Sequence, residues 1–172
     1  GIISGKINPS GKLAVTFPYS SGQIPVYYNS RRSSRPDQGK YQDITSEPLY
    51  KFGYGLSYTT YEYGDVMLSS SKINRNQELI AEIEVRNSGV MDGQETVLWF
   101  ISDPVASISR PDKALKFFEK KEIKAGEQTT FKFRIDPEKD LSFPDSDGNM
   151  HLETGDYYLI VGDKKIKFEL AD

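Results

Sequence analysis

The strongest constraint on the fold of this chain is an alternation of apolar and polar residues that recurs between residues 61 and 172. Its clearest instance is residues 78–87, where one face carries Leu79, Ala81, Ile83 and Val85. A period of two is typical of a β-strand with one buried face, because successive side chains point to opposite sides. Residues 95–103 are apolar on both faces, which predicts a central strand with Trp99 in the core.

The same criteria predict seven strands and no helix in this part of the chain. The predicted strands span residues 66–73, 78–87, 95–103, 115–123, 129–135, 156–162 and 166–170. Turn signals such as Asn87-Ser88-Gly89 separate them. The pattern predicts a mainly β protein, a seven-stranded immunoglobulin- or fibronectin III-like β-sandwich.

Residues 1–60 have a different character. Two short extended segments, 13–17 and 24–28, are expected as strands, and the first ends at Pro18. Residues 29–43 form a long polar loop, and loops of that length are often functional. This part has no convincing helix and too few apolar residues to close a core of its own. We therefore interpret it as the end of a larger domain or as a wrap around the domain that follows.

The stretch at residues 48–58 holds four aromatic residues, two glycines and a proline. Aromatic side chains carry much apolar area, and glycine supplies backbone angles that other residues avoid. That mix suits neither a regular helix nor a regular strand, and it is wrong for a flexible tether. We interpret this connector as a rigid hinge that clamps the preceding segment to the following one.

The composition argues against several kinds of site. There is no cysteine, which excludes disulfides, thiolate zinc sites and a cysteine nucleophile, and His151 is the only histidine. Residues 145–149 superficially resemble a calcium loop, but their glycine comes fourth rather than sixth, so a plain turn is expected. The net charge of −3 gives no reason to expect nucleic acid or an anionic membrane as partner. No apolar run reaches the roughly 18 residues of a membrane span.

Motifs in the first part of the chain resemble those of glycoside hydrolase family 3, the β-glucosidase and β-xylosidase family. Residues 48–58 are similar to its PLYPFGYGLSYT signature, with Lys51 where the family usually has proline. Residues 5–18 resemble GKxxPSGKLPVTFP, and residues 22–29 resemble GQIPxYYNH.

Motifs in the second part resemble the C-terminal domain of the same family. Residues 85–89 are similar to VxNxG, and residues 110–118 to RPxKxLKGF. In the latter, Phe117 replaces a common glycine. The motifs follow the order of the family and together span nearly the whole chain.

The resemblance implies a division of the chain and a parent enzyme. Residues 1–60 would be the C-terminal tail of the family's α/β sandwich domain plus an aromatic linker, and residues 61–172 a fibronectin type III-like domain. The parent would be an exo-acting, retaining β-glucosidase that hydrolyses terminal β-linked glucose, in the periplasm or secreted. The alternatives are a β-xyloside substrate and a free-standing β-sandwich that binds carbohydrate or protein. Since the sequence starts at Gly1 without methionine, a processed or excised fragment is the simplest account.

No catalytic residue is expected in this chain. The resemblance implies that the nucleophile is an aspartate of an N-terminal barrel domain and that the acid/base glutamate also lies upstream. The expected partners are therefore the upstream catalytic domains of the same polypeptide and a β-glucoside or oligosaccharide substrate. Carboxylates of the predicted strands, such as Glu82 and Glu84, belong to a polar face and are expected to be solvated.

The polar loop supplies the candidates for an indirect role at the rim of an active site. They are Arg31, Arg32, Arg35, Tyr41 and Asp43. Arginine binds carboxylates or hydroxyls, and tyrosine stacks on sugar faces. A purely structural or interdomain role is the favoured alternative for this loop. No metal and no cofactor are expected.

Overall fold

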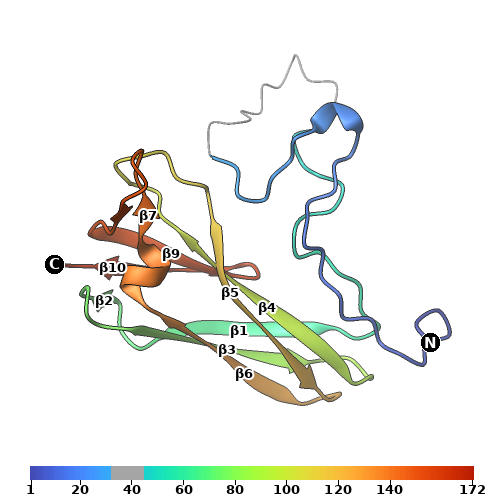
Figure 1. The fold of residues 1–172 in the computed structure, drawn as a ribbon. Helices are drawn as coiled ribbons and strands as arrows, with labels where there is room; N and C mark the ends of the chain where they lie inside the picture. The colour runs from blue at the N-terminus through green and yellow to red at the C-terminus, as the bar shows by residue number, and fades with distance from the viewer. Residues whose placement is uncertain (32–44) are drawn as a thin grey trace.

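The computed structural model describes residues 1–31 and 45–172, and its described part is mainly β (Figure 1). Seven strands have seven or more residues: β1 (Tyr61–Leu68), β3 (Leu79–Asn87), β4 (Gly93–Ser102), β5 (Ala114–Ile123), β6 (Gln128–Ile135), β9 (Gly155–Val161) and β10 (Lys164–Leu170). Three others have two residues each: β2 (Lys72–Ile73), β7 (Phe143–Pro144) and β8 (Met150–His151). The predicted mainly β class is confirmed, with these three short strands added to the expected seven.

The strands form two main sheets and a small hairpin. One sheet has three strands in the order β1-β3-β6, and the other has five in the order β2-β10-β9-β4-β5. All pairs within them are antiparallel except β2 with β10. Strand β4 lies between β9 and β5, as expected of the segment that is apolar on both faces. Strands β7 and β8 pair only with each other among the described residues.

One hydrophobic core joins the two main sheets. Its largest fully buried side chains include Trp99, Tyr157, Phe131, Phe168, Ile83 and Leu159. They occupy alternate positions of β3, β4, β6, β9 and β10, so the period-two pattern is what buries them. Each fully buried large apolar side chain contributes roughly 1.5–3 kcal/mol relative to its exposed state. The placement of Trp99 in the core is confirmed.

The prediction of a first strand over residues 66–73 is wrong. Strand β1 begins at Tyr61 and ends at Leu68, and only Lys72 and Ile73 form a further strand. The cause is a register shift between Tyr63 and Val66 in the pairing of β1 with β3. Such an irregularity moves the apolar side chains by one position, so the two halves of β1 do not share one alternation.

A short helical turn, η3 (Pro137–Leu141), interrupts the expected all-β pattern after β6. Asp136 caps it, because its carboxylate accepts the backbone N–H of Lys139 at 3.3 Å. Pro137 stands in the first turn, where a missing N–H costs nothing. Leu141 at its end is buried in the core. The expectation of no helix is wrong at this one turn.

The N-terminal segment and the connector lie side by side next to the sandwich (Figure 1). Leu13 and Phe17 form backbone hydrogen bonds of 2.8–3.3 Å with residues 50–54. We call this pairing the ribbon. The expected strands at 13–17 and 24–28 are wrong, since the only strand-like pairing there in the described residues is an isolated bridge between Phe17 and Tyr50. The partner of the first segment is the glycine-containing connector, which does not keep strand geometry.

Candidate interdomain clamp

Asn8 ties three parts of the chain together. Its side-chain oxygen accepts the hydroxyl of Ser57 at 3.0 Å and the backbone N–H of Tyr58 at 2.8 Å. Its side-chain nitrogen donates to the carbonyl of Asp92 at 3.0 Å, in the turn before β4. One short amide therefore holds the N-terminal segment, the connector and the sandwich in a fixed relation. We call the contacts of residues 8–12, 28 and 48–58 with the sandwich the clamp.

An aromatic cluster lies in the clamp. Tyr28 stacks on Phe52 with ring centroids 4.2 Å apart, and both meet Phe100 of β4 edge-on at 6.0 and 6.3 Å. Aromatic pairs in these geometries contribute about 0.5–1.5 kcal/mol each beyond the area they bury. The three rings come from the N-terminal segment, the connector and the sandwich, so the connector is a packed joint. The predicted role of its aromatic residues is confirmed at Phe52.

A buried carboxylate adds charge to the clamp. Glu95 of β4 accepts the hydroxyl of Tyr63 at 2.8 Å and lies 3.0 Å from the Lys12 ammonium group. The side chains of Lys12 and Glu95 are 25% and 6% exposed. Burial, and then the neighbouring Glu95 carboxylate, raise the pKa of Tyr63 far above its ordinary value, so this phenol remains a hydrogen-bond donor.

We expect the Lys12–Glu95 pair to stabilise the docked N-terminal segment. A double-mutant cycle with Lys12→Met and Glu95→Gln should give a coupling energy of about 1–2 kcal/mol, because the pair is largely shielded from water. The matched control is Lys72–Glu169, a 2.7 Å pair whose side chains are 61% and 44% exposed. Its cycle, Lys72→Met with Glu169→Gln, should give less than about 0.5 kcal/mol. Equal coupling in the two urea-denaturation cycles would contradict the stabilising role of the buried pair.

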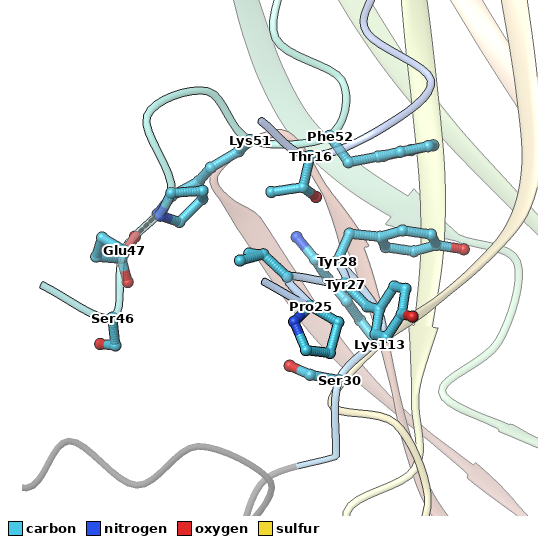
Figure 2. A pocket seen from close by; sticks show the side chains of 12 residues that line it. Thr16, Pro25, Tyr27, Tyr28, Ser30, Ser46, Glu47, Lys51, Phe52 and Lys113 are labelled. Carbon is cyan, nitrogen blue, oxygen red and sulfur yellow. Dashed lines mark ion pairs between the residues drawn. The ribbon is translucent and has the colours of Figure 1, made fainter. Parts of the chain in front are cut away.

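A cavity of about 550 Å³ opens beside the aromatic cluster (Figure 2). Tyr27, Tyr28 and Phe52 supply aromatic walls, and Glu47 and Lys51 form a 2.6 Å ion pair at its edge. Glu47 is also bound by Gln23 of the short turn η1 (Ser21–Gln23). The side chain of Gln23 is buried, and its nitrogen donates to the carbonyl of Glu47 at 3.0 Å. Residues before position 32 and residues after position 44 therefore both line the cavity.

Lys113 is a half-buried cation of this cavity. Its ammonium group lies 4.5 Å from the centre of the Phe100 ring, within the range of a cation–π contact. Burial, and then the positive charge of Lys51, lower the pKa of Lys113. An ammonium group with aromatic walls suits an anionic or hydroxyl-rich partner.

Only one of the predicted rim residues can be placed. Arg31 is exposed and forms an isolated backbone bridge with Pro111, next to a 3.1 Å bond from the Asp112 N–H to the Ser30 carbonyl. Arg31 therefore lies against the loop between β4 and β5. Arg32, Arg35, Tyr41 and Asp43 lie outside the described residues.

The carboxylates and the histidine of the sandwich have local partners. Glu84 is exposed and Glu82 half-buried, and Glu82 pairs with Lys132 at 2.6 Å. His151 lies 2.8 Å from Asp145, and this hydrogen bond is the main cause of the lowered pKa of the Asp145 carboxyl.

The expected turn at residues 145–149 is confirmed. Asp145 also accepts the backbone N–H groups of Asp147 and Asn149, both at 2.9 Å, as in a plain turn. In residues 1–31 and 45–172, no three His, Asp or Glu side chains are grouped so as to hold a metal ion. Nor does that part of the chain contain a helix with the length and apolar character of a membrane span.

Asn8 and Glu95 were not identified from the sequence as functional residues. Asn8 belongs to a turn-rich tetrapeptide, and Glu95 occupies one position of a predicted strand. Their partners lie 84 and 32 positions away in the chain, at Asp92 and Tyr63. No signal in the sequence distinguishes Glu95, since its neighbours Gln94 and Thr96 are also polar.

Two family models match the chain. Residues 1–58 match the glycosyl hydrolase family 3 C-terminal domain, and residues 95–165 match the fibronectin type III-like domain. The clamp therefore involves both matched regions.

Curated relatives match over nearly the whole chain. A periplasmic beta-glucosidase of Salmonella typhimurium is 41% identical over 94% of the chain and 22% of its own length. A putative beta-xylosidase of Formosa agariphila is 38% identical over 98% of the chain and 22% of its own length. The chain thus spans about a fifth of the length of these relatives.

Solved structures share the fold of the chain. A β-glucosidase from Erythrobacter marinus superposes with a TM-score of 0.92 at 35% identity, over 99% of the chain and 23% of that protein. A beta-glucosidase from Listeria innocua in complex with glucose gives a TM-score of 0.89 at 37% identity, over 99% of the chain and 25% of that protein. In each case the similarity covers the N-terminal segment, the connector and the sandwich together.

Proposed function

Because this chain belongs to glycoside hydrolase family 3 and corresponds to the carboxy-terminal part of its members, we propose that it is the structural portion of an exo-acting, retaining β-glucosidase. In this proposal residues 1–60 complete an upstream α/β domain, and residues 61–172 brace it as a fibronectin type III-like domain. The whole protein hydrolyses terminal β-linked glucose, and its catalytic residues lie upstream of Gly1.

The observation that carries this proposal is the apolar surface of the N-terminal segment and the connector. Thirteen of the 21 exposed large apolar side chains in the described residues belong to residues 1–58, among them Ile3, Tyr19, Tyr27 and Leu56. Monomeric soluble proteins rarely expose large apolar patches, and a concentration of exposed apolar side chains in one segment is typical of an interface. The clamp attaches this surface to the sandwich, as a brace between domains requires.

The same proposal requires no catalytic pair of carboxyl groups in this chain. Retaining hydrolysis needs two carboxyl groups about 5–5.5 Å apart on either side of a bound sugar. Several described carboxylates of the sandwich form ion pairs, such as Glu82 with Lys132 and Glu95 with Lys12. The bridge of Arg31 to Pro111 supports an interdomain role for that residue.

The name of the Salmonella relative supports a periplasmic or secreted location for the whole protein. A β-xyloside is the alternative substrate, favoured by the relatives from Formosa agariphila that are named beta-xylosidases.

The test compares this chain with a longer version that includes the upstream domains. We expect the longer protein to hydrolyse an aryl β-glucoside and the 172-residue chain to give no turnover above buffer. An aryl β-xyloside assayed in parallel distinguishes the two substrates through the ratio of kcat/KM. Turnover by the short chain would overturn the upstream placement of the catalytic residues. Inactivity of a folded longer protein on both substrates would favour the alternative role of the sandwich, the binding of carbohydrate or protein.

A further inference from the structure

A second concave site lies on the sandwich, between β5 and β6. This cavity of about 400 Å³ is lined by Lys116 and Phe117 of β5, Lys132 and Arg134 of β6, and Lys139 and Asp140 of η3. We call it the β5–β6 groove. Its lining contains no residue of the N-terminal segment or the connector, so it is separate from the clamp.

A strand irregularity places Lys116 in the groove. Trp99 pairs with Phe117 and Phe100 pairs with Leu115, which leaves Lys116 as an extra residue in β5. Bulges of this kind redirect a side chain, and here two successive residues of one strand, Lys116 and Phe117, both line the groove.

Lys116 is half-buried and is not part of any ion pair within 4.0 Å among the described residues. Burial lowers the pKa of Lys116, and the charge of Asp140 opposes that shift. Asp140 already has a partner of its own, because its carboxylate accepts the backbone N–H of Asp136 at 2.8 Å. The ammonium group of Lys116 is therefore available to an anion from solution.

Phe117 provides an aromatic surface beside this cation. One side of its ring stacks on Phe133, with centroids 5.2 Å apart and planes 12° from parallel. The side chain nevertheless remains 38% exposed, so part of the ring is open to solvent.

The charge of the groove is positive although the chain as a whole carries −3. Its lining holds four cations, Lys116, Lys132, Arg134 and Lys139, against two acids, Glu82 and Asp140. Lys132 is neutralised by Glu82 at 2.6 Å, and Arg134 pairs with Glu78 at 2.6 Å just outside the lining. Lys116 and Lys139 then stand against the single acid Asp140, which leaves an excess of one positive charge.

We propose that the β5–β6 groove binds an acidic saccharide, with a pyranose ring against Phe117 and its carboxylate at the ammonium group of Lys116. An open aromatic face beside a partly desolvated cation complements a ligand that carries both an apolar C–H face and a negative charge. Lys139 lines the same groove, and its charge attracts the carboxylate of a second sugar unit in an acidic oligosaccharide. The proposal concerns recognition by the sandwich and does not depend on the hydrolytic function proposed above.

The experiment is isothermal titration of the 172-residue chain with trigalacturonate, with cellotriose as the neutral saccharide and sodium sulfate as the simple anion. We expect a Kd of about 0.1–1 mM for trigalacturonate, which is about 4–5.5 kcal/mol of binding free energy. Cellotriose and sulfate should each bind at least about tenfold more weakly, because each satisfies only one of the two contacts.

Matched variants locate the site. Phe117→Ala and Lys116→Gln should each weaken trigalacturonate binding about tenfold or more. Phe118→Ala, on the next residue of the same strand, and Lys124→Gln, at an exposed position after β5, should leave the Kd unchanged. If circular dichroism shows that either groove variant is unfolded, Lys139→Gln replaces it, with an expected loss of about threefold. Equal affinity for cellotriose, competition by equimolar sulfate, or unchanged binding in the folded groove variants would each overturn the proposal.

Discussion

Replacing Asn87 by alanine should lower the free energy of unfolding by about 4 kcal/mol, because four buried or half-buried polar groups lose their partner at once. The Asn87 side chain is fully buried at the end of β3. Its nitrogen donates to the carbonyls of Met91 and Ile123 at 2.8 and 2.9 Å. Its oxygen accepts the Thr59 hydroxyl at 2.5 Å and the Gly89 N–H at 3.1 Å.

Urea denaturation followed by far-ultraviolet circular dichroism measures this loss. Asn76→Ala is the matched control, since Asn76 is exposed in the turn between β2 and β3 and should change stability by less than about 0.5 kcal/mol. Asn87→Asp should remain well below the wild type, because a carboxylate cannot donate to the two carbonyls. A loss below about 1 kcal/mol for Asn87→Ala would mean that water replaces the amide. The four hydrogen bonds of Asn87 would then contribute little to the stability of the fold.

Substituting Gly55 by valine should detach the N-terminal segment from the connector. A Cβ atom at residue 55 would lie 2.3 Å from the backbone carbonyl oxygen of Gly11 and 3.0 Å from Lys12 Cδ. The first contact is with backbone, so no side-chain rotation relieves it. Forcing extra atoms into a packed site costs about 1–3 kcal/mol, and the ribbon and the clamp are the parts that must move.

Amide hydrogen exchange reports this detachment locally. The N–H groups of Leu13, Phe17 and Gly53 are hydrogen-bonded across the ribbon, and their exchange should become up to about 100-fold faster in Gly55→Val. The core strands should be much less affected. The control is Gly11→Ala, on the other side of the Gly11–Gly55 contact, because a Cβ at residue 11 meets nothing within 4 Å. This substitution should leave the amide exchange of the ribbon nearly unchanged. Equal effects of the two substitutions on amide exchange would show that the contact between Gly55 and Gly11 is not sterically tight.

The sequence predicts six of the seven long strands well. Strands β3, β4, β5, β6, β9 and β10 begin and end within two residues of the predicted bounds, because their apolar residues face a single core. Strand β1 is predicted poorly because its register shift divides the pattern at Tyr63 and Val66. The segment at 13–17 alternates like a strand, but it pairs with a connector bent by Gly53, whose φ is +83°.

The candidate site is less predictable than the fold, because its contacts depend on which distant segments meet. The aromatic content of residues 48–58 predicts a packed joint, and the contact of Phe52 with Tyr28 and Phe100 confirms it. The sequence does not reveal that Asn8 is the residue that fixes this joint, since asparagine is equally common in turns that bind nothing.

The bridge between Phe17 and Tyr50 makes residues 18–49 a closed segment whose two ends are hydrogen-bonded to each other. The entropic cost of closing a chain segment grows only with the logarithm of its length, by about 0.6 kcal/mol for each doubling. Gln23, Tyr28 and Arg31 within this segment have contacts of their own, with Glu47, Phe100 and Pro111. An insertion or deletion is therefore inexpensive only where it leaves these three contacts in place. A single residue inserted between Tyr50 and Gly53 would instead shift the register of the ribbon and separate Phe52 from both of its aromatic partners.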